Sequence, residues 1–241
     1  MTDSKASADE PMQIYLANAA LQSRRYDLAA TVEIAAREAF AGVQLYVNEK
    51  QARDLAAIDD VARAARDARL GVIVHLPPET TESIAAATRC LLRHEARPRA
   101  LVHYDPVRPL PEIEGVQVGL ENAVQGLDDE YYARWLAARR ARATFVAFDL
   151  PRLFGRENVD LRAAREFASR MLRQSRPDDL LHLIDQKRPG DRRADWCVLG
   201  EGLAAPFLPR LARHGGPIVL EFETLEHALA SRDVLLRKSR L

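Results

Sequence analysis

The stretch "TFVAFDLPRLFGRENVDLRAAREFASRMLRQSRPDDLLHLI" (residues 144–184) contains the alternation that decides the fold. It opens with a short apolar run at 144–149 and closes with another at 180–184. Between these runs, "NVDLRAAREFASRMLRQ" has the apolar spacing of an amphipathic helix. Two apolar strands joined by a helix predict a parallel βαβ unit.

The same alternation continues through most of the chain. Six further brief apolar runs predict strands that helices cover. They are residues 13–17, 42–47, 71–76, 100–104, 116–121 and 217–221. Eight strands in βα alternation within 241 residues predict a closed (β/α)8 TIM barrel rather than an open doubly wound sheet.

One connection of this barrel is irregular. The segment "DPVRPLPEIEG" (105–115) follows the fourth strand and contains three prolines, which an ordinary helix does not tolerate. We therefore expect the fourth helix to be short or missing. No Ser/Gly-rich linker divides the chain, so we predict one barrel domain over residues 12–241, preceded by a disordered tail over 1–11.

Composition narrows the class of protein. Lys+Arg and Asp+Glu are equal at 35 each, which lacks the basic excess of a nucleic-acid binder. The start lacks the layout of a signal peptide, and no apolar stretch approaches the ~18–20 residues that a membrane span needs. The two cysteines form no CxxC pair. We predict a cytoplasmic protein with neither a nucleic-acid nor a membrane partner.

Charged residues at the strand ends are the candidate site. Strands in a (β/α) barrel carry the chemistry where they end and the next loops begin. Glu121, Asp149 and Glu221 end the fifth, sixth and eighth predicted strands, and His182 lies in the seventh. Strand alternation then directs Gly119, Ala147 and Val219 into the barrel, and Leu120, Phe148 and Leu220 toward the helices.

Three carboxylates that converge in one barrel mouth beside an imidazole repel one another unless a cation neutralises them. This donor set suits a divalent ion such as Mn²⁺, Mg²⁺, Co²⁺ or Zn²⁺. An ion in such a place polarises a carbonyl, and neighbouring carboxylates then move protons. The arginines Arg139, Arg140 and Arg142, on a predicted helix, are interpreted as a solvated face.

Several motifs in this order resemble one superfamily. They are "VQVGLENAV" (116–124), "FVAFDLPRLF" (145–154), "HLIDQKR" (182–188), "VLGEG" (198–202) and "PIVLEFE" (217–223). The chain resembles, over most of its length, the xylose isomerase-like (β/α)8 barrels, which include sugar phosphate isomerases and epimerases and AP endonuclease family 2-like proteins. The resemblance implies that Glu121 and Glu221 are metal-binding acid/bases, that Asp149 and His182 complete the coordination, and that Arg188 binds a substrate oxygen.

The chain departs from the family pattern at three positions. Arg152 stands where the family usually carries a histidine three residues after the sixth-strand aspartate, Trp196 replaces another histidine, and Gln44 replaces a carboxylate. Two hypotheses follow. In the first, Arg152, Arg188 and Lys187 bind an anionic group, and the protein is an isomerase, epimerase or dehydratase of a charged sugar or hydroxy acid. In the second, the metal site is lost and the barrel binds a ligand or partner without turnover.

Two histidines are further candidates. His75 and His103 lie at the ends of the third and fourth predicted strands and are expected to bind substrate or to be hydrogen-bonded core residues. The resemblance also implies a homodimer. The function that we expect from the sequence is a metal-dependent sugar, sugar-phosphate or hydroxy-acid isomerase or epimerase.

Overall fold

The strands close into one parallel barrel. The structure, a computed structural model, describes residues 12–24, 26–190 and 192–240, so the predicted tail over 1–11 lies outside the described residues. The barrel order is β1-β10-β7-β6-β5-β4-β3-β2. The strands are β1 (Ile14–Ala17), β2 (Gly42–Tyr46), β3 (Gly71–His75), β4 (Arg99–His103), β5 (Gln117–Glu121), β6 (Val146–Asp149), β7 (Leu180–Leu183) and β10 (Ile218–Leu220). All eight predicted strands and the TIM-barrel class are confirmed.

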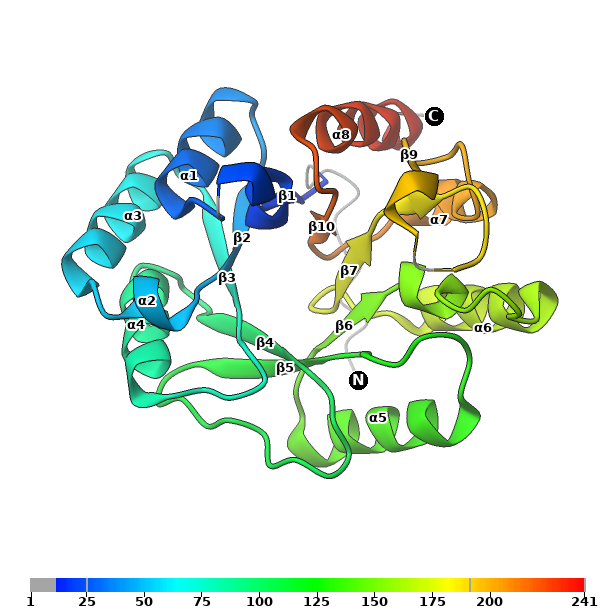
Figure 1. Ribbon diagram of the computed structural model, residues 1–241, viewed down its shortest axis with the longest axis horizontal. Coiled ribbons are helices and arrows are strands. Elements are labelled where there is room, and N and C mark those ends of the chain that lie inside the picture. The colour runs from blue at the N-terminus through cyan, green and yellow to red at the C-terminus, as the bar shows by residue number, and fades with distance from the viewer. Residues whose placement is uncertain (1–11, 25, 191, 241) are drawn as a thin grey trace, which may run out of the picture.

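Helices surround these strands (Figure 1). The α-helices are α1 (Leu28–Arg37), α2 (Glu49–Ala52), α3 (Leu55–Asp67), α4 (Glu82–Leu92), α5 (Asp129–Arg142), α6 (Leu161–Gln174), α7 (Leu208–Leu211) and α8 (Leu225–Ser239). The 3₁₀ helices are η1 (Asn18–Arg24), η2 (Pro151–Phe154), η3 (Arg193–Asp195) and η4 (Ala205–Phe207). A two-stranded antiparallel sheet joins β8 (Asp185–Gln186) to β9 (Trp196–Cys197). Among the described helices, none has the length and apolar character to cross a membrane.

The connection from β4 to β5 is the irregular one. Residues 104–116 form turns and extended backbone without a helix, as the three prolines predict. The last barrel strand, β10, is followed closely by the helix α8. The Thr224 hydroxyl accepts a hydrogen bond from the His227 backbone N–H and begins α8, so Glu221 lies in the short connection between the end of β10 at Leu220 and this cap.

Strand alternation divides the core in two. Ala147 and Val219 lie in a small cluster inside the barrel, together with Phe145 and Leu180. The residues predicted to face the helices lie in the larger outer cluster, and they are Leu120, Phe148 and Leu220. A Cβ on Gly119 would lie 2.2 Å from the Phe145 ring, so this glycine also faces inward. This parity directs every second side chain at the carboxyl ends of β5 and β6 into the barrel mouth.

The solvated face predicted for the arginines of α5 is wrong for one of them. Arg139 is buried, and its guanidinium donates to the Asp179 carboxylate at 2.7 Å. The same carboxylate accepts the backbone N–H groups of Val146 and Arg176. Asp179 thereby joins α5 to the starts of β6 and β7, and this role cannot be seen in the local charge pattern of the helix.

Removal of the Asp179 carboxylate should therefore destabilise the barrel. Asp179→Ala leaves the buried Arg139 charge unpaired and two backbone N–H groups without their acceptor, which should lower the free energy of unfolding by about 3–5 kcal/mol. Urea denaturation followed by circular dichroism measures this. The exposed neighbour Asp178 is the matched control. Equal stability of Asp178→Ala and Asp179→Ala would contradict the role assigned to Asp179.

Candidate metal and proton-transfer centre

Four predicted ligands meet at the barrel mouth. Glu121 ends β5, Asp149 ends β6, His182 lies in β7 and Glu221 directly follows β10. The sheet register pairs Asp149 with His182, and the Glu221 backbone N–H still donates to Leu183 of β7. His182 Nδ1 lies 3.3 Å from Oε2 of Glu121 and 3.3 Å from Oε2 of Glu221. The imidazole is thus held between two glutamates.

Glu121 is the most enclosed of the three carboxylates. Its side chain is 1% exposed, and His75 Nε2 lies 2.9 Å from Oε2 while His103 Nε2 lies 3.2 Å from Oε1. His75 and His103, predicted to bind substrate, therefore contact the buried carboxylate itself. The His75 and His103 rings also meet edge to face, with centroids 4.9 Å apart. Three histidines from β3, β4 and β7 surround one carboxylate.

The charges shift one another's pKa values. Burial by itself would raise the pKa of Glu121, but His182 and the hydrogen bonds of His103 and His75 outweigh it and hold that pKa well below its usual value. Burial would lower the pKa of His182, but Glu221 and Glu121 raise it well above the ordinary value. Burial by itself would raise the pKa of Glu221, but the charge and the close contact of His182 together lower it. These pKa shifts favour the charged forms of His182 and of the two glutamates beside it.

Asp149 is held by a different set of partners. Arg152 Nε lies 2.7 Å from Asp149 Oδ2, and the Arg152 backbone N–H donates to Oδ1 at 3.3 Å. Burial, followed by the nearby negative charges of Glu121 and Glu221, raises the pKa of Asp149 although Arg152 opposes the shift. The Asn122 side chain fixes the Asp149 backbone: Oδ1 accepts the Asp149 N–H at 2.8 Å, and Nδ2 donates to the Asp149 carbonyl at 3.0 Å.

Gln44, one of the departures from the resembled family pattern, contacts one of the glutamates. Gln44 Nε2 donates to Glu221 Oε1 at 2.6 Å. An amide at this position adds a donor to Glu221 and no negative charge to the mouth. One oxygen of Glu221 is therefore fixed by β2, and the other faces His182.

Two predicted substrate residues lie elsewhere. Lys187 and Arg188 are exposed, and Arg188 Nη2 pairs with Asp195 at 2.7 Å. Neither lines the pocket beside the carboxylates. Arg152 does line this pocket, but its guanidinium contacts Asp149, the Ala123 carbonyl and His103. The structure thus brings Arg152 into the centre and leaves Lys187 and Arg188 outside it.

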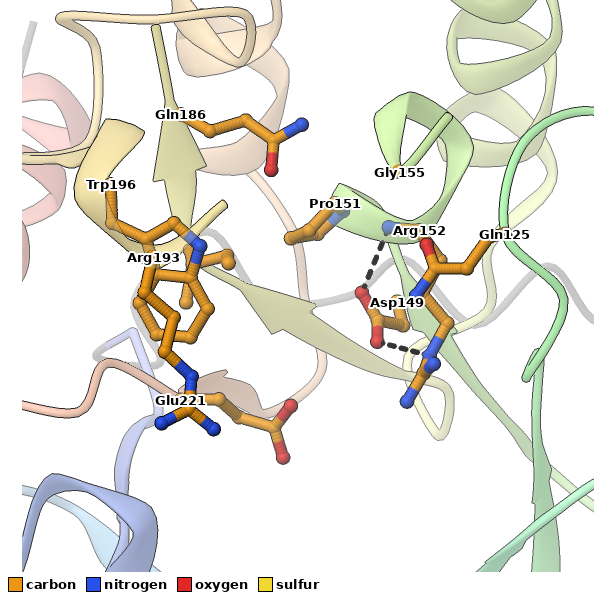
Figure 2. Close-up of a pocket in the computed structure, with 10 residues that line it drawn as sticks. Gln125, Asp149, Pro151, Arg152, Gly155, Gln186, Arg193, Trp196 and Glu221 are labelled. Atoms are coloured by element: carbon orange, nitrogen blue, oxygen red, sulfur yellow. Dashed lines mark hydrogen bonds and ion pairs between the residues drawn. The ribbon is translucent and has the colours of Figure 1, made fainter. Parts of the chain in front are cut away.

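A pocket of about 220 Å³ opens beside the centre. Figure 2 shows Asp149, Arg152 and Gln125 across this pocket from Glu221, Arg193 and Trp196. Gln186 and Ile184 complete part of the wall. The sequence pattern gives no sign that Gln125, Gln186 and Arg193 line the pocket, because all three lie in loops or short elements whose path no periodicity predicts.

The Gly200-Glu201-Gly202 motif shapes one wall of this pocket. The buried Asp185 carboxylate accepts the backbone N–H groups of Gly200 at 2.8 Å, Gly202 at 3.0 Å and Ala204 at 2.9 Å. A Cβ on Gly202 would lie 2.3 Å from the Gln186 carbonyl oxygen, so only glycine allows this close wrap. Asp185 also anchors β8, which pairs with β9 and positions Trp196.

The donor chemistry of the mouth fits a divalent ion. Glu121, Asp149 and His182 each offer a ligand atom, and these atoms lie within 4.8 Å of one another. His182 is buried, and among the described residues neither of its ring nitrogens makes a hydrogen bond of good geometry. A cation bound between this imidazole and the two carboxylates would give the buried ring nitrogen a partner and would neutralise the carboxylates. A second such group comprises His75, His103 and Glu121.

Proteins of known structure share the barrel fold of this chain. No protein-family model matches the chain, and no curated protein matches it. Among solved structures, a xylose isomerase domain protein from Planctomyces limnophilus superposes with a TM-score of 0.62 at 15% identity, covering 95% of this chain and 96% of that chain. The chain has the xylose isomerase-like barrel fold.

Two further solved structures superpose over a similar length. A xylose isomerase-like TIM barrel protein from Mycobacterium smegmatis, in complex with magnesium, gives a TM-score of 0.56 at 13% identity over 96% of this chain and 90% of its own. D-psicose 3-epimerase, in the presence of D-fructose, gives 0.54 at 11% identity over 95% of this chain and 99% of its own. At sequence identities this low, the structural similarity establishes the fold alone, and the function must be argued from the residues of the site.

Asn122 should be a positioning residue for Asp149. Asn122→Ala removes three buried hydrogen bonds, to the Asp149 N–H, the Asp149 carbonyl and the Tyr132 hydroxyl. We expect a loss of about 2–4 kcal/mol in the free energy of unfolding because buried polar groups lose their partners. Thermal and urea unfolding measure it, with the exposed Asn158→Ala as the control. Unfolding of both variants at the wild-type midpoint would refute the assignment.

Proposed function

We propose that the protein is a metal-dependent isomerase or epimerase of a sugar, sugar phosphate or hydroxy acid, with Glu121 and Glu221 as its paired carboxylates. The observation that carries the proposal is the position of His182 Nδ1, 3.3 Å from each glutamate, in the mouth of a xylose isomerase-like barrel. Structures of the same fold include a D-psicose 3-epimerase and a sugar phosphate isomerase/epimerase from Parabacteroides distasonis, which supports this reaction class.

Glu121, Asp149, His182 and Glu221 would hold the ion. Three carboxylates and one imidazole suit Mn²⁺, Mg²⁺ or Co²⁺ better than a structural zinc site, which favours thiolates. The magnesium in the Mycobacterium smegmatis barrel is consistent with a hard cation in this fold. When bound, such an ion polarises a substrate carbonyl and makes the neighbouring C–H more acidic.

The two glutamates are unequal, and this divides their roles. The Glu221 side chain is 26% exposed and lines the pocket, whereas the Glu121 side chain is 1% exposed and contacts three histidines. Glu221 is therefore the group that reaches a substrate C–H bond beside a carbonyl and takes its proton, leaving the electron pair shared with the carbonyl oxygen. Return of a proton to the former carbonyl carbon, with transfer of the adjacent hydroxyl proton to the former carbonyl oxygen, gives isomerisation. Return of a proton to the other face of the same carbon restores the carbonyl and gives epimerisation.

Gln44 and His182 prepare Glu221 for this step. Gln44 holds Oε1, and His182 faces Oε2 and favours the ionised carboxylate, which is the form that accepts a proton. Glu121, with its pKa held well below the usual value, stays ionised and serves mainly as a ligand. The expectation from the sequence that both glutamates move protons remains a proposal, with Glu221 as the better-placed residue.

A second candidate is a barrel that binds a ligand or partner without turnover. The contact between Arg152 and Asp149 favours it, because a guanidinium can neutralise these carboxylates without a metal ion. The two candidates differ in whether a divalent ion is needed and in whether a substrate proton exchanges with solvent. The homodimer and the cytoplasmic location remain predictions from the sequence.

Proton exchange tests the proposal directly. The protein is incubated with Mn²⁺ in D₂O and with D-psicose, D-fructose or a phosphorylated ketose, and deuterium incorporation is followed by NMR. Glu221→Gln should lower the exchange rate at least about 100-fold, because an amide cannot accept the proton. The exposed Glu201→Gln should exchange at the wild-type rate. Exchange that survives in Glu221→Gln would remove Glu221 from the reaction, and wild-type protein that exchanges none of these sugars would favour the binding barrel.

A further inference from the structure

Arg152 occupies a place that is unusual for a substrate-binding arginine. Its Nε lies 2.7 Å from Asp149 Oδ2, and its Nη2 lies 3.5 Å from Glu121 Oε1. Both oxygens belong to residues that would ligate the ion. Figure 2 shows the Arg152 side chain lying against Asp149 at one wall of the pocket. The guanidinium is thus inserted into the carboxylate set itself.

The local backbone holds Arg152 in this position. Arg152 lies in η2, which Pro151 begins directly after β6, and its backbone N–H donates to Asp149 Oδ1. Its Nη1 donates to the Ala123 carbonyl at 3.3 Å. The side chain is 22% exposed, so its charge has lost most of its hydration and depends on the carboxylates for compensation. These contacts hold the charge in one place, unlike that of a mobile surface arginine.

Arg152 and a divalent ion would compete for the same carboxylates. Glu121, Asp149 and Glu221 supply three negative charges around a small volume, and a guanidinium stays positive at every physiological pH. A divalent ion ligated by Asp149 would share its carboxylate with Arg152 Nε. Two cations on one buried carboxylate repel strongly, because little water lies between them.

We propose that Arg152 is the resident counter-cation of this carboxylate set, and that a divalent ion binds by displacing its guanidinium from Asp149. The inference rests on the proposed function only in taking the same carboxylates as the ligands of the ion. Beside His182, Arg152 offsets part of the negative charge of the mouth in the metal-free protein and weakens its affinity for the ion. The ion site is therefore weaker than its three carboxylates and imidazole alone would make it.

Isothermal titration of chelator-treated protein with MnCl₂, at mildly alkaline pH, tests this inference. Removal of a competing charge should tighten binding, so Arg152→Gln should lower the Mn²⁺ dissociation constant at least about tenfold. Arg152→Lys keeps a cation and should stay closer to the wild type. Arg162→Gln, which removes an exposed arginine from its surface pair with Glu166, is the matched control and should leave the constant unchanged.

A stability measurement covers the case in which Arg152→Gln folds poorly without metal. If Arg152 is the counter-cation, MnCl₂ should raise the unfolding temperature of Arg152→Gln more than that of the wild type, because the ion replaces the missing charge. Weaker or unchanged Mn²⁺ binding in Arg152→Gln, with normal binding in the wild type, would overturn the inference and leave the proposed function standing. Absence of Mn²⁺ binding in both proteins would overturn the proposed metal site as well as the inference.

Discussion

The carboxylate of Glu121 has lost almost all contact with water, and its compensation organises the barrel mouth. His75 comes from β3, His103 from β4 and His182 from β7, and each places a ring nitrogen within 3.3 Å of a Glu121 oxygen. A buried carboxylate without such partners would cost several kcal/mol. Because the Glu121 carboxylate needs these three imidazoles, β3, β4 and β7 must end at matching heights in the barrel mouth.

From this constraint follows an asymmetry between the two halves of the mouth. The side of Glu121 is closed by imidazoles, and the side of Glu221 opens to the pocket lined by Trp196 and Gln186. A chemical step that needs contact with substrate belongs on the open side, and a group that fixes a cation belongs on the closed side. Arg152 lies against Asp149 and near Glu121, across the pocket from Glu221, and its positive charge offsets the negative charge of these carboxylates.

The barrel and its polar strand ends could be predicted because both depend on short-range rules. Alternation fixes which face a residue takes, and the carboxyl ends of parallel strands meet in one place, so Glu121, Asp149 and Glu221 were found from their positions alone. Contacts between residues that are far apart in the sequence could not be predicted from these short-range rules. The burial of Arg139 against Asp179 depends on a residue 40 positions away, and the helix sequence around Arg139 resembles a solvated face.

Loop residues were the least predictable part of the site. The family resemblance implied a substrate contact for Arg188, but Arg188 lies exposed in the loop between β8 and β9 and pairs with Asp195. Gln125 and Arg193 enter the pocket through paths that no periodic pattern describes. Asn122 lies in the VQVGLENAV motif, but its two hydrogen bonds to the Asp149 backbone can be recognised only from the side-chain geometry.

Anomalous diffraction from crystals grown with Mn²⁺ shows whether Glu121, Asp149, His182 and Glu221 form one cation centre. The expected result is one strong anomalous peak in the barrel mouth, within coordination distance of these four side chains, with the Arg152 guanidinium moved away from Asp149. An empty mouth at saturating Mn²⁺, with Arg152 still on Asp149, would contradict it and identify the arginine as a permanent replacement for the metal.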